Sequence, residues 1–182
     1  EKGTVTIIVQ IVGKTTKDLA QIEEGEYLLD FVGPLGMPTP LEGLKKVAVI
    51  GGGLGTAIAY PQAKKLHQLG ADVTVITGFR NKDLIILEDE LKEVSNKLIV
   101  ATDDGSNGNQ GFVTDMLQKE IDAGEKFDEV IAIGPLVMMK FVCKLTEKYD
   151  IPTTVSMNPI MIDGTGMCGG CRIIVDGETK FA

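Results

Sequence analysis

The sequence predicts an α/β protein built on a doubly wound, parallel five-stranded sheet. From residue 47 onward, short apolar segments of strand length alternate with longer segments of helical character. A run of glycines follows the first of these strands directly. Alternation of this kind requires crossover connections, which put helices on both faces of the sheet and ligands at the carboxyl ends of its strands. Each loop that follows a strand is therefore a candidate binding segment.

Composition excludes several classes of protein. The chain has 182 residues, of which 43% are hydrophobic, and this argues for a packed core and against disorder. Its net charge of −8 argues against a nucleic-acid partner, because phosphates attract basic surfaces. No apolar run approaches the roughly 20 residues of a membrane-spanning helix. We therefore expect a cytoplasmic protein with no membrane partner, whose three cysteines do not form a disulfide framework.

Residues 1–40 are expected to be the C-terminal part of an incomplete β-barrel. Two segments, 4–12 and 27–32, are rich in β-branched and aromatic residues and are predicted to be strands. The glycine- and proline-rich residues 33–40 would be a linker. Two strands do not make a stable sheet by themselves. Because neither end of the chain carries the polar tail that is usual at a natural terminus, we expect a fragment.

The second predicted domain, residues 41–160, begins with a strand at 47–50, a glycine turn and a helix at 56–70. The unpaired N–H groups and the dipole of a helix N-terminus favour a phosphate, and glycines let a ligand approach the backbone closely. The same pattern also occurs in tight turns that bind nothing. The turn therefore indicates a pyrophosphate site that the later loops must support.

The other elements of this domain follow in alternation. Strands are predicted at 73–77, 98–102, 129–133 and 153–157, and helices at 83–94, 112–123 and 138–148.

Three of the loops that follow these strands suit a nucleotide. After the second strand, Arg80 stands where an acid is usual, and it is either a partner for a 2′-phosphate or adenine, or a solvated cation. After the third strand, Asp103 and Asp104 suit a ribose or a nicotinamide amide, or they belong to a turn that caps the next helix. After the fourth strand, Gly134 and Pro135 let a flat ligand meet the backbone, whereas the methionines that follow are more often core residues.

Residues 161–182 form the third predicted segment and carry two cysteines separated by two residues. Cys168 and Cys171 lie in a glycine-rich loop, a pattern typical of zinc, an iron–sulfur cluster or a redox dithiol. A four-ligand site needs more than two sulfurs, so Asp163, a residue beyond Ala182, or both would complete it. Cys143 is expected to be a small core residue.

In this order the loops GGGLGTAIAYP, TGFR, TDDGSNGNQGFVT, IGPLVMM and DGTGMCGGCR resemble those of the ferredoxin-reductase-like electron-transfer flavoproteins. The resemblance covers the whole chain. It is strongest to the small subunits of NADH-dependent reduced ferredoxin:NADP oxidoreductases, also described as sulfide dehydrogenases, and extends to the electron-transfer subunits of dihydroorotate dehydrogenase and the gamma subunits of cytoplasmic hydrogenases. It implies NAD(H) or NADP(H), FAD and a [2Fe-2S] cluster as cofactors, and a larger catalytic or electron-accepting subunit as partner.

The resemblance also implies roles for individual residues. Those matched to FAD contacts are Val9, Gln10, Thr15 and Thr16. Those matched to the dinucleotide are Gly52, Gly53, Gly55, Thr56, Thr77, Gly78, Arg80, Asp103, Asp104, Gly134 and Pro135. Those matched to cluster ligands are Asp163, Cys168 and Cys171. No residue is expected to act as a general acid or base, because such a protein positions and tunes its cofactors.

Two features of the family are missing from the chain. The Arg-x-Tyr/Phe-Ser signature that holds the flavin is absent, and the remaining cysteine ligand would follow Ala182. We therefore expect the cluster to be incomplete and the fragment to be inactive alone.

The predicted function is that of an electron-transfer oxidoreductase subunit, which passes electrons from NAD(P)H through FAD to a [2Fe-2S] cluster and a partner subunit. One alternative is a stand-alone NAD(P)H-dependent reductase in which Cys168 and Cys171 form a redox dithiol. Another is a non-catalytic dinucleotide-binding module with zinc at the same cysteines. Metal analysis separates the three.

Overall fold

The computed structural model describes residues 3–181 and divides the chain into two compact units. Residues 39–159 form the first, here called the sheet unit. Residues 3–38 and 160–181 form the second, here called the terminal unit. Residues 1, 2 and 182, which belong to the predicted end segments, lie outside the described residues.

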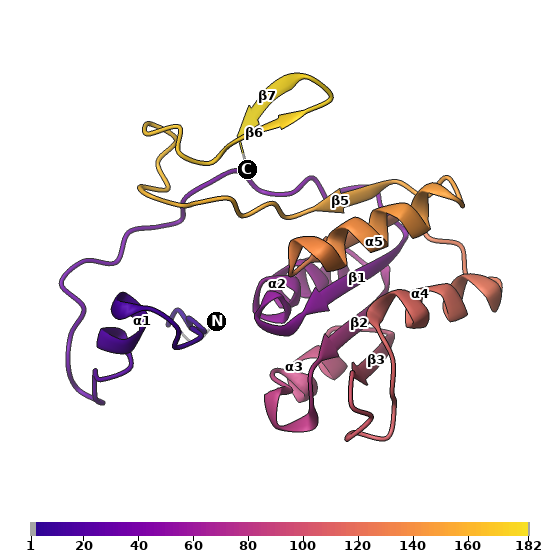
Figure 1. The fold of residues 1–182 in the computed structure, drawn as a ribbon, viewed down its shortest axis with the longest axis horizontal. Helices are drawn as coiled ribbons and strands as arrows, with labels where there is room; N and C mark the ends of the chain where they lie inside the picture. Colours follow the sequence, from indigo (N-terminus) through magenta and orange to yellow (C-terminus); the bar gives the residue numbers. More distant parts are fainter. Residues whose placement is uncertain (1–2, 182) are drawn as a thin grey trace. The chain divides into compact units, whose positions relative to one another are not determined.

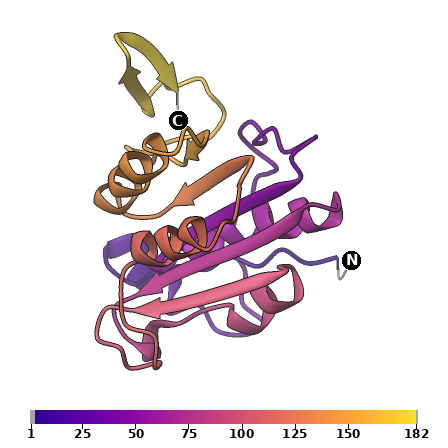
Figure 2. The same ribbon diagram turned by 90° about the vertical axis from the view of Figure 1, so that its right-hand side faces the viewer.

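Five parallel strands make up the sheet unit's sheet (Figure 1). They are β1 (Lys46–Gly52), β2 (Asp72–Phe79), β3 (Lys97–Thr102), β4 (Glu129–Ile133) and β5 (Thr153–Val155). Their order is β3-β2-β1-β4-β5, so the chain moves from β1 to one edge and then returns to the other side of β1 (Figure 2). This confirms the doubly wound parallel sheet that the sequence predicts. The strand order reverses between β1 and β4, which makes this the switch point of the fold.

Helices cover both faces of the sheet. They are α2 (Thr56–Gln68), α3 (Glu88–Glu93), α4 (Val113–Asp122) and α5 (Leu136–Glu147), with the 3-10 turns η1 (Gly53–Gly55) and η2 (Lys82–Leu84). Successive side chains of β1 point to opposite faces: Val47 and Val49 pack with α2 and α3, and Ala48 and Ile50 pack with α4 and α5. All four are fully buried, which explains the continuous apolar run. Among the described residues, no helix has the length and apolar character needed to cross a membrane.

The helix predicted over residues 83–94 is only partly correct. Asn81 caps the short turn η2 by accepting a hydrogen bond from the Asp83 N–H at 3.1 Å. Leu87 then adopts a φ of 58°, in the left-handed region that interrupts a right-handed helix. The α-helix is therefore confined to Glu88–Glu93. A single non-glycine residue in this conformation has no clear signature in the sequence.

The terminal unit contains a short helix, α1 (Lys14–Leu19), and an antiparallel hairpin of β6 (Arg172–Val175) and β7 (Glu178–Phe181). The strands predicted at 4–12 and 27–32 are wrong, since the structure assigns neither segment to a sheet. A strand needs a neighbour to pair its backbone groups, and no described segment pairs with either of these.

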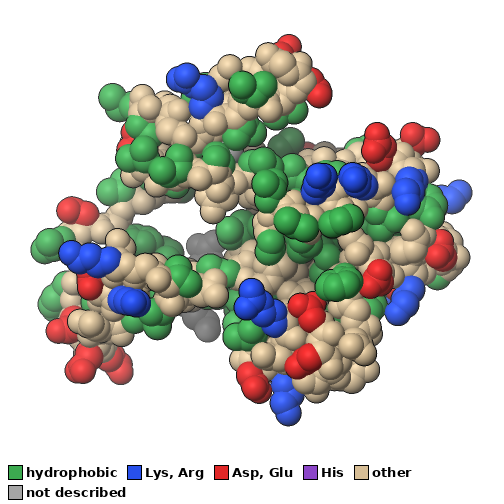
Figure 3. All heavy atoms as spheres, viewed as in Figure 1, with side chains coloured by type: hydrophobic (Ala, Val, Ile, Leu, Met, Phe, Trp, Pro, Cys, Tyr) green, Lys and Arg blue, Asp and Glu red, His purple; other side chains and the backbone are tan. Residues whose placement is uncertain are grey.

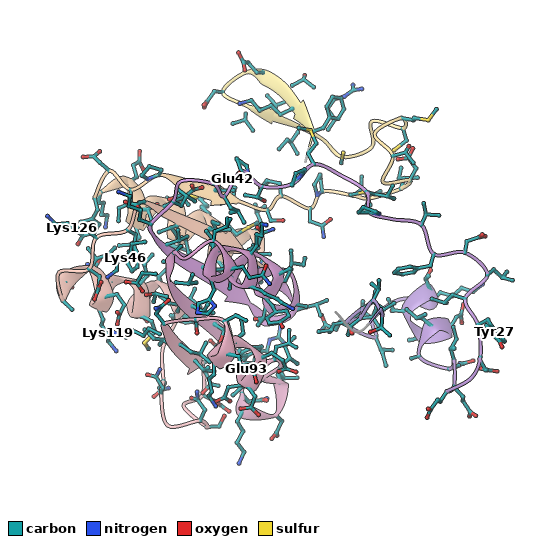
Figure 4. The ribbon with its side chains drawn as sticks, turned by 180° about the vertical axis from the view of Figure 1, so that it is seen from behind. Tyr27, Glu42, Lys46, Glu93, Lys119 and Lys126 are labelled. Carbon is teal, nitrogen blue, oxygen red and sulfur yellow. The ribbon has the colours of Figure 1, made fainter. Side chains whose placement is uncertain are left out.

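The unpaired segments leave their apolar side chains exposed. Leu29 is fully exposed, Tyr27 is 90% exposed and projects from the chain (Figure 4), and Val5 is 74% exposed. Hydrophobic side chains are visible over much of this unit's surface (Figure 3). The alternation typical of a strand is present in these segments, but no described segment packs over their apolar side chains.

The amino ends of three neighbouring strands are joined by charged groups. The Nζ atom of Lys46, which Figure 4 labels, pairs with Asp72 at 3.1 Å and with Glu125. These contacts, led by that with Glu125, raise the pKa of Lys46. The Asp128 carboxylate accepts the N–H groups of Lys45 at 2.8 Å and Lys46 at 2.9 Å. These two hydrogen bonds, with that from Lys46 the larger, lower the pKa of Asp128. The network fixes the end of the sheet opposite the switch point.

Candidate functional site

The carboxyl ends of β1 and β4, which pair with each other, lie side by side at the switch point. β1 ends at Gly52 and continues through η1 into α2, while β4 ends at Ile133 and continues through Gly134 and Pro135 into α5. The two loops touch, because a Cβ atom placed on Gly134 would lie 3.0 Å from the Cα of Gly52. Open α/β sheets bind ligands at this position. The structure thus brings together two of the segments that the sequence singles out.

At three glycines of the turn, neighbouring protein atoms lie too close to leave room for a Cβ atom. A Cβ on Gly51 or Gly55 would lie 2.9 Å or 2.8 Å from backbone atoms, closer than the 3.0 Å that real Cβ atoms respect. A Cβ on Gly52 would lie 2.5 Å from the Sδ atom of Met138. These glycines therefore allow β1 to pack closely against α2, α5 and the loop after β4, which is a structural role.

Gly53 differs from the other glycines of the turn. It has a φ of 53°, and its Cβ position has no atom within 4 Å, so the space beside it is open. No side chain caps the N-terminus of α2, and the first turn of that helix carries no acidic residue. An open glycine next to an uncapped helix N-terminus fits a phosphate group. Of the glycines predicted to bind the dinucleotide, Gly53 is the one with room for it.

Two buried hydroxyls flank the same turn. Thr77 pairs with Gly51 across β1 and β2, and Thr56 Oγ1 lies 2.9 Å from the Cβ position of Gly51. The exposed fractions of Thr56 and Thr77 are 0% and 1%, and neither Oγ1 atom has a hydrogen-bond partner within the described part of the chain. Buried hydroxyls normally have partners, so these two mark a place that a polar group or water would complete. Both predicted binding residues therefore lie beneath the turn.

The loops after β2 and β3 are tied together by backbone hydrogen bonds. The Asp103 N–H donates to the Phe79 carbonyl at 2.9 Å, the Asp104 N–H to the Arg80 carbonyl at 3.3 Å, and the Lys82 N–H to Ser106 Oγ at 2.7 Å. Arg80, Asp103 and Asp104 are all exposed. The structure therefore gathers these predicted residues on the β2 side of the switch point.

Asp104 organises its own loop. Its Oδ1 accepts the Ser106 N–H at 2.9 Å, and the hydroxyl of Ser106, followed by this N–H, lowers the pKa of Asp104. The alternative prediction, that Asp103 or Asp104 caps the next helix, is wrong. Asp115, inside α4, accepts the Phe112 N–H at 2.9 Å and caps that helix instead. Asp104 is therefore an ionised, exposed group beside Arg80.

The loop after β3 also forms hydrogen bonds to the carboxyl-terminal half of that strand's outer edge. The Val100 carbonyl accepts the side-chain amides of Asn107 and Asn109, each at 2.9 Å. The Thr102 N–H donates to the Asn109 carbonyl at 3.0 Å, and the Thr102 carbonyl accepts the Gly111 N–H at 3.2 Å. Sequence reasoning did not single out these asparagines. Their signal is the enrichment of Asn in a glycine-rich loop, where its side chain bonds to nearby backbone.

The cysteine loop is organised by Asp163. Its Oδ1 accepts the Thr165 N–H at 3.0 Å and its Oδ2 accepts the Cys168 N–H at 3.1 Å. These contacts, led by the Thr165 N–H, lower the pKa of Asp163. The Gly170 N–H donates to the Cys168 sulfur at 3.3 Å. Cys168 is exposed and Cys171 is half-buried.

This loop has the donor set of an iron–sulfur site in part. Two thiols and an N–H bonded to sulfur are groups that such a cluster uses, and the carboxylate of Asp163 is the third ligand that the resemblance implies. Within residues 3–181, however, no three His, Cys, Asp or Glu side chains are grouped so that they hold a metal ion. The structure brings Asp163 to the backbone of Cys168 and does not gather the three predicted ligands around one point. The metal site at Asp163, Cys168 and Cys171 stays a prediction.

The residues matched to FAD lie in the terminal unit. Val9 is 41% exposed, and Gln10 and Thr15 are exposed. Thr16 Oγ1 accepts the N–H groups of Val12 and Gly13, each at 3.0 Å, so it serves the start of α1. Their role toward a flavin stays a prediction.

The strand order β3-β2-β1-β4-β5, with its switch point between β1 and β4, is that of the doubly wound α/β domains that bind nucleotides. A family model described as the oxidoreductase NAD-binding domain matches residues 49–144. The chain is 48% identical over 182 residues to a homolog of the electron transfer subunit of dihydroorotate dehydrogenase B (NAD(+)) from Thermotoga maritima, covering 100% of this chain and 64% of that protein. It is 36% identical over 196 residues to the electron transfer subunit from Fusobacterium nucleatum, covering 100% of this chain and 74% of that protein.

A solved structure of NADH-dependent reduced ferredoxin-NADP oxidoreductase aligns with a TM-score of 0.86 and 47% identity, covering 95% of this chain and 62% of that chain. The chain therefore belongs to the oxidoreductase NAD-binding domain family, within the group that includes the dihydroorotate dehydrogenase B electron transfer subunits. This confirms the resemblance to ferredoxin-reductase-like proteins. The chain spans 64% of the length of the first relatives that it matches.

Proposed function

We propose that this chain is the dinucleotide-binding part of an electron-transfer oxidoreductase subunit, which takes electrons from NAD(P)H and passes them through FAD and a [2Fe-2S] cluster to a partner subunit. A relative is named as an electron transfer subunit homolog, and an aligned structure is of an NADH-dependent oxidoreductase. When bound, NAD(P)H supplies a hydride, and a flavin and a cluster divide the electron pair into single electrons. We further propose that the protein is cytoplasmic.

The observation that carries the proposal is the combination of Gly53 with the start of α2. The open Cβ position of Gly53 leaves room for a pyrophosphate, and the helix end beside it has no side-chain cap. Arg80 and Asp104 lie on the β2 side, where a dinucleotide of this fold class has its adenosine half. The chain's own part is therefore to bind and orient the dinucleotide.

Isothermal titration calorimetry with NADH, NADPH and ADP-ribose tests this proposal. We expect saturable binding of ADP-ribose and of at least one dinucleotide, in the range of roughly 1 μM to 1 mM that is typical for enzyme substrates. Arg80→Ala should weaken NADPH more than NADH if the guanidinium meets a 2′-phosphate, and both equally if it stacks on adenine. If neither ADP-ribose nor a dinucleotide binds, the proposed function is wrong.

The cluster needs a separate experiment. In a version of the protein that continues past Ala182, we expect iron with an equal amount of acid-labile sulfide, bound through Asp163, Cys168 and Cys171. Zinc in place of iron would favour a non-catalytic binding module. A metal-free protein with two titratable thiols would favour a stand-alone reductase with a redox dithiol. Asp163→Cys should keep the cluster and shift its reduction potential, and an unchanged potential would show that Asp163 is not a ligand.

A further inference from the structure

The amino-terminal half of β3 has an outer edge with unpaired backbone groups. β3 is the last strand in the order of the sheet, with β2 as its neighbour. The Val100 C=O and both backbone groups of Thr102 point outward, because the loop after β3 bonds to them. Successive residues of a strand alternate in direction, so Leu98 also points its N–H and C=O outward. Within residues 3–181, no hydrogen bond to either group of Leu98 or to the Val100 N–H is found.

A cavity of about 440 Å³ lies beside this edge. Its lining includes Leu98 and Val100, which are both half-buried, and the polar residues Asn96, Asn107 and Asn109. The volume falls in the range of about 300–1,000 Å³ that is typical of binding sites, so there is room for a short segment of another molecule. The edge of β3 is therefore open to a neighbouring chain at Leu98, whereas the two asparagines of the following loop close it from the Val100 carbonyl onward.

The wall of the cavity that α3 supplies is acidic. Glu88 and Lys92 line it, and Lys92 Nζ lies 2.9 Å from Glu88 Oε1 and 3.2 Å from Asp89 Oδ1. One lysine is thus shared between two carboxylates, and α3 also carries Glu90 and Glu93. The wall therefore has an excess of negative charge, and it favours a basic side chain on a molecule that lies in the cavity.

The same charge argues against a second copy of this chain at the edge. Two β3 strands that paired in the antiparallel direction would be related by a two-fold axis perpendicular to the sheet. Both α3 helices would then lie on one face, and their carboxylates would repel each other. The chain also has a net charge of −8, so its copies repel one another over a longer range. These features fit a segment of a different, basic chain.

We propose that the outer edge of β3, at Leu98 and Val100, binds an extended basic segment of a partner protein as an added strand. In an antiparallel pairing, one residue of the segment exchanges two hydrogen bonds with Leu98, and the Val100 N–H donates a third. A basic side chain of the segment pairs with Glu88. None of these groups belongs to the predicted dinucleotide residues, so the inference goes beyond the proposed function and does not depend on it.

Hydrogen exchange of backbone amides, measured by NMR on ¹⁵N-labelled protein, tests the pairing. The probe is the peptide acetyl-Val-Lys-Val-Lys-Val-amide, added up to about 10 mM, at which a millimolar complex is nearly saturated. We expect the exchange of the Leu98 and Val100 amides to slow by about fivefold or more, equivalent to about 1 kcal/mol for one hydrogen bond. The Ile99 amide, which points to β2, is the internal control and should not change.

Two matched peptides separate backbone pairing from other contacts. The same peptide with N-methyl groups on its backbone cannot pair as a strand, so it should leave both amides unchanged. The acidic counterpart, acetyl-Val-Glu-Val-Glu-Val-amide, should bind about threefold more weakly or less well still, because it meets the carboxylates of α3. Equal protection by the N-methylated peptide would refute strand addition, and equal affinity for the acidic peptide would refute the preference for a basic segment.

Three variants locate the site. Leu98→Pro removes the outward N–H, which an edge strand tolerates, and should weaken the basic peptide by about fivefold or more. An unchanged circular dichroism spectrum shows that this variant is folded. Glu88→Gln should weaken the same peptide by about two- to fivefold, the range of one exposed ion pair. Glu93→Gln, on the same helix but outside the lining of the cavity, is the matched control and should change nothing.

The remaining outcomes contradict the inference. If the basic peptide slows neither the Leu98 nor the Val100 amide, the edge does not accept a strand. Binding that Leu98→Pro and Glu88→Gln both leave unchanged would place the peptide elsewhere on the surface. Self-association of the protein in sedimentation velocity, lost in Leu98→Pro, would identify a second copy as the occupant. None of these results depends on NADH or ADP-ribose, so they test this inference independently of the proposed function.

Discussion

The backbone that faces Gly55 leaves no room for a side chain at this position. The carbonyl carbon of Ile133 would lie 2.8 Å from a Cβ at this position, and backbone of a central strand has little freedom to move. Gly55→Ala should therefore lower the free energy of unfolding by about 2–3 kcal/mol, as overpacking of a rigid site does. Urea denaturation followed by circular dichroism measures the change. A loss below about 0.5 kcal/mol, the range of neutral surface changes, would mean that the strands separate more easily than their packing implies.

Gly53 has the opposite character, since it has open space and a left-handed backbone. Asparagine tolerates this conformation better than other residues with a side chain, so Gly53→Asn should leave stability nearly unchanged. Its side chain would fill the space beside α2 and weaken both NADH and ADP-ribose by about tenfold or more, equivalent to about 1.4 kcal/mol. Gly70→Asn, at a φ of 85° where α2 ends, is the matched control. Unchanged ADP-ribose binding in Gly53→Asn would place the pyrophosphate elsewhere.

The contrast between these glycines shows where sequence reasoning reaches its limit. The sequence indicates that the turn needs glycine, because a strand, a glycine run and a helix follow one another. It does not indicate whether each missing Cβ makes room for protein or for ligand, since that depends on which loop lies alongside. Met138 illustrates the same limit: from sequence it is one apolar residue in a helix, and only the approach of β4 to β1 places it over Gly52.

At the scale of elements, one ion pair joins β3 to α4. Lys97 Nζ lies 2.6 Å from Glu120 Oε2, and Glu120 is only 7% exposed. Lys97→Met removes the cation and leaves a buried carboxylate without this partner, which should lower the free energy of unfolding by about 1–3 kcal/mol. The double variant Lys97→Met, Glu120→Leu should recover most of the loss. Chemical denaturation of the set tests this, and a single variant as stable as wild type would contradict the account.

The carboxylate of Asp128 ties two N–H groups at the start of β1 and makes stability depend on pH. Its pKa falls on folding because it accepts the N–H groups of Lys46 and Lys45. A carboxyl of this kind stabilises the folded state above its unfolded pKa of about 3.9, and the contribution is lost as the pH falls through the lower folded pKa. Asp128→Asn should therefore be less stable than wild type at pH 7, and the difference should shrink below pH about 4.

Thermal unfolding across this pH range measures the effect, with Asp150→Asn as the control. Asp150 is exposed, and among the described residues no hydrogen bond to its carboxylate is found, so its replacement removes a surface carboxylate without removing a contact to the sheet. A constant difference between Asp128→Asn and wild type from pH 3 to pH 7 would assign the loss to something other than the charge.

Elements marked by their own sequence pattern could be predicted, whereas those whose structure depends on contacts with other segments could not. β4 has the predicted bounds, since its apolar run ends at a glycine. β2 extends two residues beyond its prediction, through Gly78 and Phe79, because Gly78 pairs with Gly52. The predicted helix over residues 83–94 breaks at Leu87, whose left-handed conformation is imposed by context. The segments predicted as strands at 4–12 and 27–32 have the right alternation, but no described segment pairs with them.

At the scale of the molecule, the two units differ in how they bury apolar groups. The sheet unit has cores on both faces of its sheet, whereas the terminal unit exposes residues such as Leu29, Met37 and Met167 at 100%, 96% and 88%. Thermolysin, which cuts beside apolar residues, should therefore cleave within residues 27–38 and 160–168 first and leave a protected fragment close to residues 39–159. Mass spectrometry identifies the fragment. Early cleavage inside the sheet unit would contradict its independent stability.

The hydrogen bonds between the outer edge of β3 and the loop that follows it have a consequence for assembly. An edge strand with free backbone groups can pair with a strand from another chain, both in functional complexes and in aggregates. Here Asn107 and Asn109 occupy the Val100 carbonyl, and the following loop satisfies both backbone groups of Thr102. The carboxyl-terminal half of this edge is therefore already hydrogen-bonded within the chain. A partner that adds a strand at this half of the edge would first have to displace these hydrogen bonds, whereas one that recognises side chains and shape would not.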